Sequence, residues 1–422
     1  MTRSRLPHPR ELHYGWWLML ASGLGIAVSS ALLIWTFGLY IDPVEEQFGW
    51  TRAEVSLAIT VAFLASGLSS PLVGKWADRY GPRSVILSGA VLGAGAYALL
   101  STTDALWQWY VFYALAGVSL AMTFVIPFQS LASRWFARRR GMALGILAVG
   151  ISLGGIAGVP VFRVLIEEFG WDVAFLISAG TLAGTLIPLS LLMIRNKPAD
   201  MGMRLDGAAV VAGEASPPEV QPGLPLRAAI RTPIFWTITL GIAAFFYASF
   251  GFVIHTIPLF ESVGVSTTWA STILSIMAAS GVASRIVFSW LVDRGFRFEF
   301  VGILVAAGGG SSALVLLGDT GIAAIVVFIL FWSINEGGPA LLEPLSVVRT
   351  FGAAHFGTIL GTVGLIRIVL MVSAPTVAGA IFDATGSYDL ALVLFIGLFA
   401  LAISLFYVTL HLHHPSLTPD SA

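Results

Sequence analysis

The sequence contains no cysteine, and only 11% of its 422 residues are charged. The absence of cysteine excludes disulfides, thiolate metal sites and cysteine nucleophiles. The shortage of charge excludes an ordinary soluble domain, in which about a quarter of the residues are charged. The net charge of −1 points to no nucleic acid or other charged macromolecule as a partner.

What the chain has instead is apolar length. Hydrophobic residues make up 57% of it, and its mean hydropathy is +0.88. Apolar runs of about 20 residues recur, each long enough to cross a hydrocarbon core about 30 Å thick as a helix. They are too long and too uniformly apolar for the alternating strands of a membrane β-barrel. We therefore predict an all-α membrane protein with about twelve transmembrane helices, at 15–41, 54–77, 84–101, 107–133, 141–167, 172–194, 234–261, 268–293, 299–317, 321–348, 356–382 and 388–411.

The basic residues indicate the orientation of these spans. With the N-terminus in the cytoplasm, 18 of the 22 lysines and arginines fall on the cytoplasmic side. Arg52 and Arg163 lie at outer ends, and Arg285 and Arg367 lie within spans. Positive charge on the cytoplasmic side is the rule for membrane helices. We expect a multi-pass protein with both termini in the cytoplasm, and the lack of cysteine and of N-x-[ST] sites favours a bacterial inner membrane.

A polar segment rich in proline, glycine and glutamate interrupts the apolar pattern at 195–232. It is too weakly hydrophobic to span the membrane or to fold alone, which is typical of a linker. Six predicted spans precede it and six follow. We therefore expect an N-terminal six-helix bundle at 1–194, a cytoplasmic linker at 195–232 and a C-terminal six-helix bundle at 233–422.

The two sides of the linker match each other at a displacement near 215 positions. The sequence FGWTRAE at 48–54 aligns with VGVSTTW at 263–269, and DRYG at 78–81 aligns with DRG at 293–295. Each match is weak by itself, but their common displacement indicates a duplicated unit. Parallel repeats of this kind enclose a substrate site near the middle of the membrane.

Several motifs point to a known family. The stretch GKWADRYGPR, at 74–83, resembles the loop signature of the major facilitator superfamily, in its expected place between the second and third spans. The sequences YGWW at 14–17, FGWTRAEVS at 48–56 and SRWFARRRGMALGILAVGISLGG at 133–155 are similar to one branch of it. That branch holds bacterial monocarboxylate transporters and oxalate/formate antiporters. The resemblance implies two pseudo-symmetric six-helix bundles, the major facilitator fold, and secondary active transport by alternating access.

The signature loop of the resembled family latches the cytoplasmic helix ends through charge pairs that form in one state and break in the other. The resemblance therefore implies a gating role for seven residues: Gly74, Asp78, Arg79, Gly81, Arg83, Asp293 and Arg294. Pro82 departs from the usual basic residue. The alternative is ordinary positive-inside topology, which explains the arginines but not the aspartates at one position of both repeats.

Four ionisable residues stand out inside the predicted spans, namely Arg285, Glu336, Glu343 and Arg367. A charge near the bilayer centre costs about 2.5–3.5 kcal/mol on insertion scales, so each is a candidate for function. A guanidinium presents a fork that matches a carboxylate and stays charged at any relevant pH. In the resembled branch an arginine of the eighth span binds the substrate carboxylate, and oxalate-type exchangers add a second basic residue in the eleventh span. The resemblance therefore implies substrate-binding roles for Arg285 and Arg367. The alternative is that the four residues form buried ion pairs that only hold the second half together.

Two acidic residues within the predicted spans could carry protons. Glu336 and Glu343, seven residues apart and expected on a similar face of the tenth span, are the candidates for proton coupling. Buried carboxyl groups tend to protonate, so an anion that enters against Arg285 while Glu336 takes a proton keeps the site neutral. Animal-type monocarboxylate carriers place an acid one turn before that arginine, where this chain has Gly281. Exchange of one anion for another needs no such acid.

Other polar and aromatic side chains within the spans are weaker candidates. Asn335 and Tyr247 could contact the substrate, although Asn335 points about 100° away from the neighbouring glutamate around the helix. His255, two turns from Tyr247 on one face, fits packing better than a proton relay. Trp35 and Phe37 of the first span could line the pocket or pack within the bundle.

Other function classes lack their sequence signatures. There is no HExxH and no nucleotide-binding loop, which argues against a zinc-dependent intramembrane enzyme and a primary pump. A channel would repeat its selectivity structure around a symmetric oligomer, whereas the charges here lie in one half of one chain. We predict a monomeric secondary transporter of a small organic anion, a monocarboxylate with proton symport, that needs no metal or cofactor. The alternatives are an anion exchanger of oxalate/formate type and a drug or sugar carrier.

Overall fold

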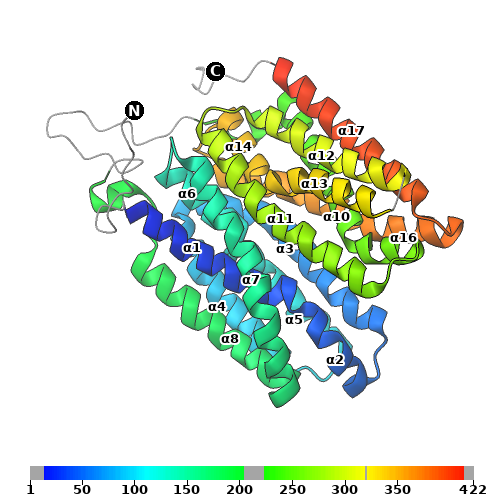
Figure 1. Cartoon of the computed structure of the whole chain (residues 1–422). Helices are drawn as coiled ribbons and strands as arrows, with labels where there is room; N and C mark the ends of the chain where they lie inside the picture. Colours follow the sequence, from blue (N-terminus) through cyan, green and yellow to red (C-terminus); the bar gives the residue numbers. More distant parts are fainter. Residues whose placement is uncertain (1–13, 204–222, 319–320, 413–422) are drawn as a thin grey trace, which may run out of the picture. The chain divides into compact units, whose positions relative to one another are not determined.

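The computed structural model describes residues 14–203, 223–318 and 321–412, and all regular structure within these ranges is helical (Figure 1). Eleven helical segments of this described part are long and apolar enough to cross a membrane. Helix α11, Thr267–Asp293, adds a further 27 residues, about 40 Å at a rise of 1.5 Å per residue. The prediction of an all-α membrane protein with about twelve spans is confirmed.

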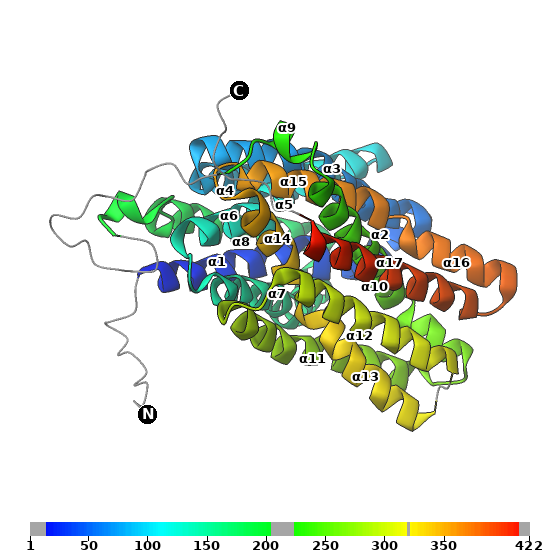
Figure 2. The same cartoon turned by 90° about the horizontal axis from the view of Figure 1, so that it is seen from above.

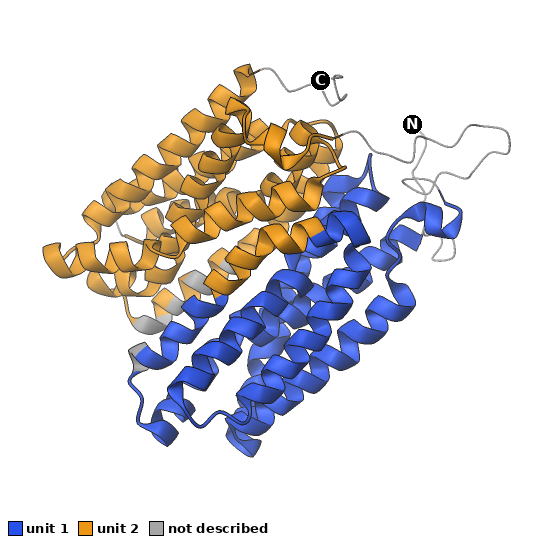
Figure 3. Ribbon diagram, turned by 180° about the vertical axis from the view of Figure 1, so that it is seen from behind, with its two compact units in different colours: residues 1–62, 76–220 blue, residues 63–75, 221–422 orange. Residues whose placement is uncertain are grey.

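The chain forms two compact units, residues 1–62 with 76–220 and residues 63–75 with 221–422 (Figure 3). The division predicted at 194 and 233 stays a prediction, and residues 204–222 of the linker lie outside the described ranges. In chain order, the helices up to residue 203 are α1 (Tyr14–Ser30), the π-helix η2 (Ala31–Trp35), the 3₁₀-helix η3 (Phe37–Tyr40), α2 (Ile41–Phe48), α3 (Arg52–Tyr80), α4 (Pro82–Leu100), α5 (Leu106–Thr123), α6 (Val125–Trp135), α7 (Arg140–Phe169), α8 (Trp171–Pro188), the π-helix η4 (Leu189–Met193) and the 3₁₀-helix η5 (Pro198–Met201).

The second part of the chain repeats this all-helical pattern. Beyond residue 223, and besides α11, the helices are α9 (Leu226–Ala229), α10 (Pro233–Ser262), α12 (Phe298–Gly318), α13 (Ile322–Gly337), α14 (Pro339–Phe351), α15 (Phe356–Met371), α16 (Ala374–Thr385) and α17 (Asp389–His411).

Helices pack along one another within each unit. In the second unit α17 lies along α10 and α12 (Figure 2), and in the first unit α1 packs on α7 while α4 packs on α5 and α8. The outer faces still carry large exposed apolar side chains, such as Leu72, Ile156 and Leu192. Helices that are apolar on all sides are typical of membrane spans, because lipid replaces water around them.

The middle of α3 belongs to the second unit because it packs closely against α15. A Cβ atom on Gly74 would overlap the carbonyl group of Gly357, and a Cβ atom on Gly361 would overlap the carbonyl group of Ser70. Small residues let two helix backbones approach in this way. The sequence placed Gly74 in a gating loop, and the structure gives it a definite steric role in helix packing.

The spans predicted at 107–133, 321–348 and 356–382 are each divided into two successive helices, and each pair still makes up one segment long and apolar enough to cross a membrane. The breaks fall at Phe124, at Gly338 and at residues 372–373. Pro127, Pro339 and Pro375 lie within the first three residues of the helices that follow the breaks, and each lacks the N–H that would bond to the carbonyl four residues earlier. The first helix of each pair therefore ends at or near that unmatched carbonyl.

The two repeats begin their second long helix with the same turn. The Thr51 hydroxyl accepts a hydrogen bond from the backbone N–H of Glu54, and the Ser266 hydroxyl accepts one from that of Trp269. Such side-chain caps satisfy helix donors that have no partner within the helix. The preceding glycines, 49 and 264, both have positive φ, at 68° and 87°. All three pairs of positions are 215 residues apart, so the sequence repeat is also a repeat of local structure.

Candidate functional site

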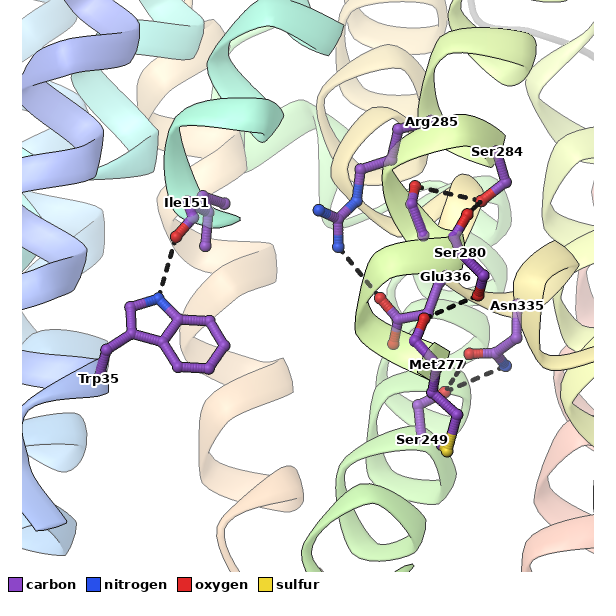
Figure 4. Close-up of polar contacts among 10 residues, drawn as sticks. Trp35, Ile151, Ser249, Met277, Ser280, Ser284, Arg285, Asn335 and Glu336 are labelled. Atoms are coloured by element: carbon purple, nitrogen blue, oxygen red, sulfur yellow. Dashed lines mark hydrogen bonds and ion pairs between the residues drawn. The ribbon is translucent and has the colours of Figure 1, made fainter. Parts of the chain in front are cut away.

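Among the described residues of the second unit, two ion pairs lie within the spans, and the first of them joins α11 to the end of α13. Arg285 Nη2 donates a hydrogen bond to Glu336 Oε2 at 3.0 Å (Figure 4). The arginine side chain is 16% exposed and the glutamate side chain 24%. The two side chains are therefore mostly covered by protein, but part of each remains accessible to a small ligand.

A glycine on α11 makes room for this pair. Gly281 lies one helical turn before Arg285, and a Cβ atom there would come within 3.0 Å of the Glu336 Cβ and 3.4 Å of its Oε2. Position 281 is where the animal-type carriers have an acid and this chain has none. In this structure the acid that pairs with Arg285 is Glu336 of α13, and its side chain occupies the space that Gly281 leaves open.

The second ion pair joins α15 to α14. Arg367 Nε lies 3.2 Å from Glu343 Oε2, but its N–H is not aligned on that oxygen, so the contact is electrostatic rather than a hydrogen bond. The guanidinium also lies over the ring of Phe246, 4.6 Å from Cζ to the ring centroid, and Nη1 lies 3.9 Å from the Met371 sulfur. A cation over an aromatic face is held by the ring quadrupole.

The two glutamates thus pair with different arginines. The expectation that Glu336 and Glu343 share one helix face is wrong, because α13 ends at Gly337 and α14 begins at Pro339. The break gives each acid its own helix and its own partner. Two arginines and two glutamates leave the four groups with no net charge when all are ionised.

Asn335 and Tyr247 lie near this region but outside both pairs. Asn335 is buried, and its amide exchanges hydrogen bonds of 3.3 Å with the Ser249 hydroxyl and donates to the Val305 carbonyl at 3.4 Å. These contacts tie together α10, α12 and α13. Tyr247 is half-buried on α10, beside the Phe246 that covers Arg367. The structure accounts for Asn335 by packing and leaves the substrate roles of both residues as predictions.

His255 of α10 is held between two other helical segments. Its Nδ1 lies 3.0 Å from the Tyr388 hydroxyl and its Nε2 lies 2.9 Å from the Pro375 carbonyl. A carbonyl only accepts, so Nε2 donates and Nδ1 accepts from the tyrosine. Burial, with the nearby Asp383 carboxylate, raises the pKa of Tyr388, so its hydroxyl keeps the proton that it donates. This arrangement fits the packing role that the sequence favoured.

In the first unit the two aromatic candidates have separate roles. Trp35 is 43% exposed, and its indole N–H donates to the Ile151 carbonyl at 3.0 Å (Figure 4). Its ring covers Gly155 of α7, where a Cβ atom would collide with it. Phe37 is buried against the edge of Tyr113. Phe37 is thus a packing residue, whereas one face of Trp35 stays open.

The signature loop, between the end of α3 and the start of α4, contacts η4 and the residues that follow it. Gly81 has φ of 87°, and a Cβ atom there would collide with Asn196. The Arg83 guanidinium donates to the Ser190 and Leu191 carbonyls at 2.8 and 2.9 Å. Arg79 is exposed and lies over its neighbouring Tyr80 ring. These residues fix the loop within the first unit, and their gating role stays a prediction.

Asp78 and Asp293 occupy matching places at the ends of α3 and α11. Both are half-buried, and the arginine after each is exposed. Arg294 lies over the Trp290 ring at 3.9 Å. Both aspartates lie in the last turn of their helix, and the gating role of these residues stays a prediction.

The sequence analysis missed two arginines that act on those same helix ends. Arg134 Nη2 donates to the Ala77 and Asp78 carbonyls at 2.8 and 3.2 Å. Arg349 donates to the Phe296 carbonyl at 2.9 Å through Nη1 and to the Val292 carbonyl at 3.2 Å through Nη2. We call these two contacts the carbonyl clamps. A cation at the C-terminal end of a helix satisfies its last carbonyls and its dipole.

The signal for the clamps was present in the sequence. Arg134 and Arg349 are 215 positions apart, and so are their acceptors Ala77 and Val292. Charge counting assigned both arginines to topology alone. The repeat displacement, applied to basic residues as well as to motifs, would have found them.

A further buried acid, Glu299, lies at the end of a membrane-spanning helix rather than near its middle. Glu299, at the start of α12, is 1% exposed and binds Arg297 through both carboxylate oxygens, at 2.9 and 3.3 Å. The hydrogen bonds to this carboxylate raise the pKa of the Arg297 guanidinium. An acid in the first turn of a helix is also stabilised by the helix dipole.

Among the described residues, no group of three or more histidine, aspartate or glutamate side chains could hold a metal ion. The charged groups described above for this region form two cation–carboxylate pairs. Such an arrangement can bind an anion and exchange a proton.

Comparison with known proteins agrees with this geometry. A model of the major facilitator superfamily matches residues 23–367. The chain is 27% identical over 350 residues to an oxalate:formate antiporter of Oxalobacter formigenes, covering 80% of this chain and 78% of that one. It is 25% identical over 407 residues to monocarboxylate transporter 13 of Bos taurus, covering 95% and 90%.

The fold is also similar to that of a solved structure. The proton:xylose symporter XylE bound to 6-bromo-6-deoxy-D-glucose superposes with a TM-score of 0.68 at 13% identity, covering 94% of this chain and 95% of that one. The family match spans well over half of the chain, and the prediction of this family is confirmed. The chain belongs to the major facilitator superfamily and is a multi-pass membrane transporter of small molecules that works by alternating access.

Proposed function

We propose that this transporter carries a small monocarboxylate together with a proton, with Arg285 as the anion-binding residue and Glu336 as the proton site. The observation that carries the proposal is the 3.0 Å hydrogen bond between these two side chains within the spans. In it, a carboxylate is already seated on the guanidinium. A substrate carboxylate has the same shape and charge, so it can take the same place.

Displacement of Glu336 explains why a proton would accompany the anion. When a substrate occupies Arg285, the acid loses its counter-charge in a poorly solvated site. A carboxylate in that situation is more stable as the neutral acid. Uptake of one proton by Glu336 then keeps the net charge of the site unchanged when one monoanion enters.

The relatives support a carboxylate as cargo. One is named an oxalate:formate antiporter and another a monocarboxylate transporter. Both names describe substrates with the group that Arg285 is suited to bind. The solved sugar symporter, at 13% identity, supports the fold and no substrate.

The test is uptake into proteoliposomes with a labelled panel of lactate, pyruvate, formate, oxalate and malonate. An inward proton gradient should accelerate uptake of at least one monocarboxylate by the wild-type protein. Glu336→Gln should abolish that acceleration, because an amide cannot carry the proton. Proton-driven uptake that survives Glu336→Gln would refute the role of this acid, and no uptake of any carboxylate would refute the substrate class.

Anion exchange is a second candidate, favoured by the named antiporter relative. Exchange requires that the anion alone returns across the membrane while Glu336 stays paired or charged. Preloading proteoliposomes with unlabelled substrate distinguishes the two. Stimulation by internal anion without a proton gradient would indicate exchange, whereas dependence on the gradient indicates symport.

The surroundings of the site enter the same proposal. The signature-loop residues and their counterparts in the second repeat, Asp293 and Arg294, would form the gate that opens and closes the cytoplasmic side. The excess of basic residues on one side of the spans supports cytoplasmic termini in a bacterial inner membrane. One chain holds both ion pairs, which supports a monomer as the working unit.

A further inference from the structure

The two arginines within the spans of the second unit are each paired with an acid, although one arginine is enough to bind a monocarboxylate. Arg285 has Glu336 at 3.0 Å, and Arg367 has Glu343 at 3.2 Å. A protein built to bind a dianion between two cations would leave both cations to the substrate. The second acid is therefore unexplained by the proposed function alone.

The acids of the two pairs differ in their position within a helix and in their exposure. Glu336 is the penultimate residue of α13, beside the Gly337–Gly338 break, and its side chain is 24% exposed. Glu343 lies inside α14 directly before Pro344, and its side chain is 13% exposed. An acid at a helix end next to glycines can move away more readily than one within a helix.

Arg367 also makes contacts besides its ion pair with Glu343. Phe246 covers its guanidinium at 4.6 Å, and Met371 lies one turn away on the same helix at 3.9 Å from Nη1. These contacts keep the guanidinium beside Glu343. We therefore expect the Arg285 pair to open for cargo while the Arg367 pair stays closed.

We propose that Glu343 is a specificity-determining residue, which occupies Arg367 and so restricts the cargo to anions with one carboxylate. This inference rests on the proposed function, since it assumes that Arg285 binds the cargo carboxylate. Its consequence is that dicarboxylates are excluded by charge, not by size.

The charge balance of the four groups explains the exclusion. A monoanion with one proton on Glu336 leaves their sum at zero. A dianion with the same proton leaves an extra negative charge, which a poorly solvated site stabilises badly. Removal of the Glu343 charge would supply the missing positive charge, and Arg367 could then accept the second carboxylate.

The experiment compares the wild-type protein with Glu343→Gln in proteoliposomes at about pH 7.5, with lactate and a series of dicarboxylates from oxalate to glutarate. The measured quantity is the ratio of dicarboxylate to lactate uptake. Glu343→Gln should raise this ratio by at least about tenfold for the dicarboxylate of best length, which corresponds to about 1.4 kcal/mol of binding free energy. The length preferred by the variant would report how far apart the two guanidinium groups can hold carboxylates.

Two further variants keep the test specific. Glu343→Gln combined with Arg367→Gln should return the ratio to the wild-type value, because no free cation remains. Glu167→Gln, which removes the acid of the exposed Arg163–Glu167 pair, should not change it. A folded Glu343→Gln protein with an unchanged ratio would overturn the inference, as would wild-type protein that carries dicarboxylates as well as lactate. Neither of these two results would contradict the proposed function. Failure of the wild-type protein to carry any carboxylate would refute the proposed function itself.

A measurement on the wild-type protein covers the case in which Glu343→Gln does not fold. Lowering the pH converts a dicarboxylate into its monoanion. If charge excludes it, malonate uptake relative to lactate should rise as the monoanion fraction rises. A ratio that stays flat over this range would overturn the inference.

Discussion

The two repeats share their helix ends and differ in the middle of the membrane. In each, an arginine binds the last carbonyls of the second long helix, Arg134 on Ala77 and Arg349 on Val292. The ion pairs have no such counterpart. The positions 215 residues before the four charged residues hold Ser70, Ala121, Phe128 and Ser152. The features kept in both repeats concern how the helices are held, whereas the ion pairs that we propose for binding the cargo are found in one repeat.

The physical reason for this difference lies in the groups involved. Every helix ends in carbonyls without partners, so a clamp is useful wherever the repeat places a helix end. A charge in the membrane is costly and is kept only where it has a partner or a task. The asymmetry therefore predicts that changes in the second unit alter substrate chemistry, and that matched changes in both units alter stability alike.

The largest effect is expected at Arg285. Arg285→Gln leaves the Glu336 carboxylate without its counter-charge and removes the proposed anion ligand. Loss of one partner of a largely buried pair costs about 3–5 kcal/mol, so uptake should fall by at least about 100-fold. Initial uptake rates in proteoliposomes measure it. Arg285→Lys keeps the positive charge but not the two parallel donors of a guanidinium, so its uptake rate should lie between those of the wild-type protein and Arg285→Gln. If Arg285→Gln takes up substrate at the wild-type rate, the ion pair has only a structural role.

The carbonyl clamps come next, and they test the symmetry directly. Arg134→Gln and Arg349→Gln should each lower the free energy of unfolding by about 1–3 kcal/mol, because buried carbonyls lose charged donors. Thermal unfolding in detergent compares them on one scale. A loss confined to one of the two variants would break the equivalence that the common displacement indicates.

The Asn335 amide is expected to have a smaller, purely structural effect. Ser249→Ala removes one of its hydrogen-bond partners and should cost about 1 kcal/mol of unfolding free energy, with KM unchanged. Asn335→Ala should behave in the same way. A higher KM in Asn335→Ala alone would instead support the substrate role predicted for that amide.

The smallest effect is expected at an exposed ion pair of the first unit. Arg163 and Glu167 pair at 2.7 Å one turn apart, with side chains 68% and 57% exposed. Exposed pairs contribute little because water already solvates both charges. Arg163→Gln should leave the melting temperature and uptake unchanged. A clear loss of uptake would show that charge in the first unit also takes part in transport.

Much of the fold could be predicted from the sequence. Length and continuity of the apolar runs placed the spans, since each must cross the same thickness of lipid. The family followed from local motifs such as the stretch at 74–83, because loop signatures lie close together in the chain. What periodicity could not show were the breaks before Pro339 and Pro375, because the apolar pattern continues from one helix into the next.

For the site, the sequence by itself determined which residues carry charge inside the membrane, because composition and hydropathy are properties of the chain alone. It also determined that the four charges sum to zero. Only the tertiary structure decided that Glu336 pairs with Arg285 and Glu343 with Arg367. The reason is physical: these partners are 51 and 24 positions apart, and only the packing of separate helices decides which of them meet.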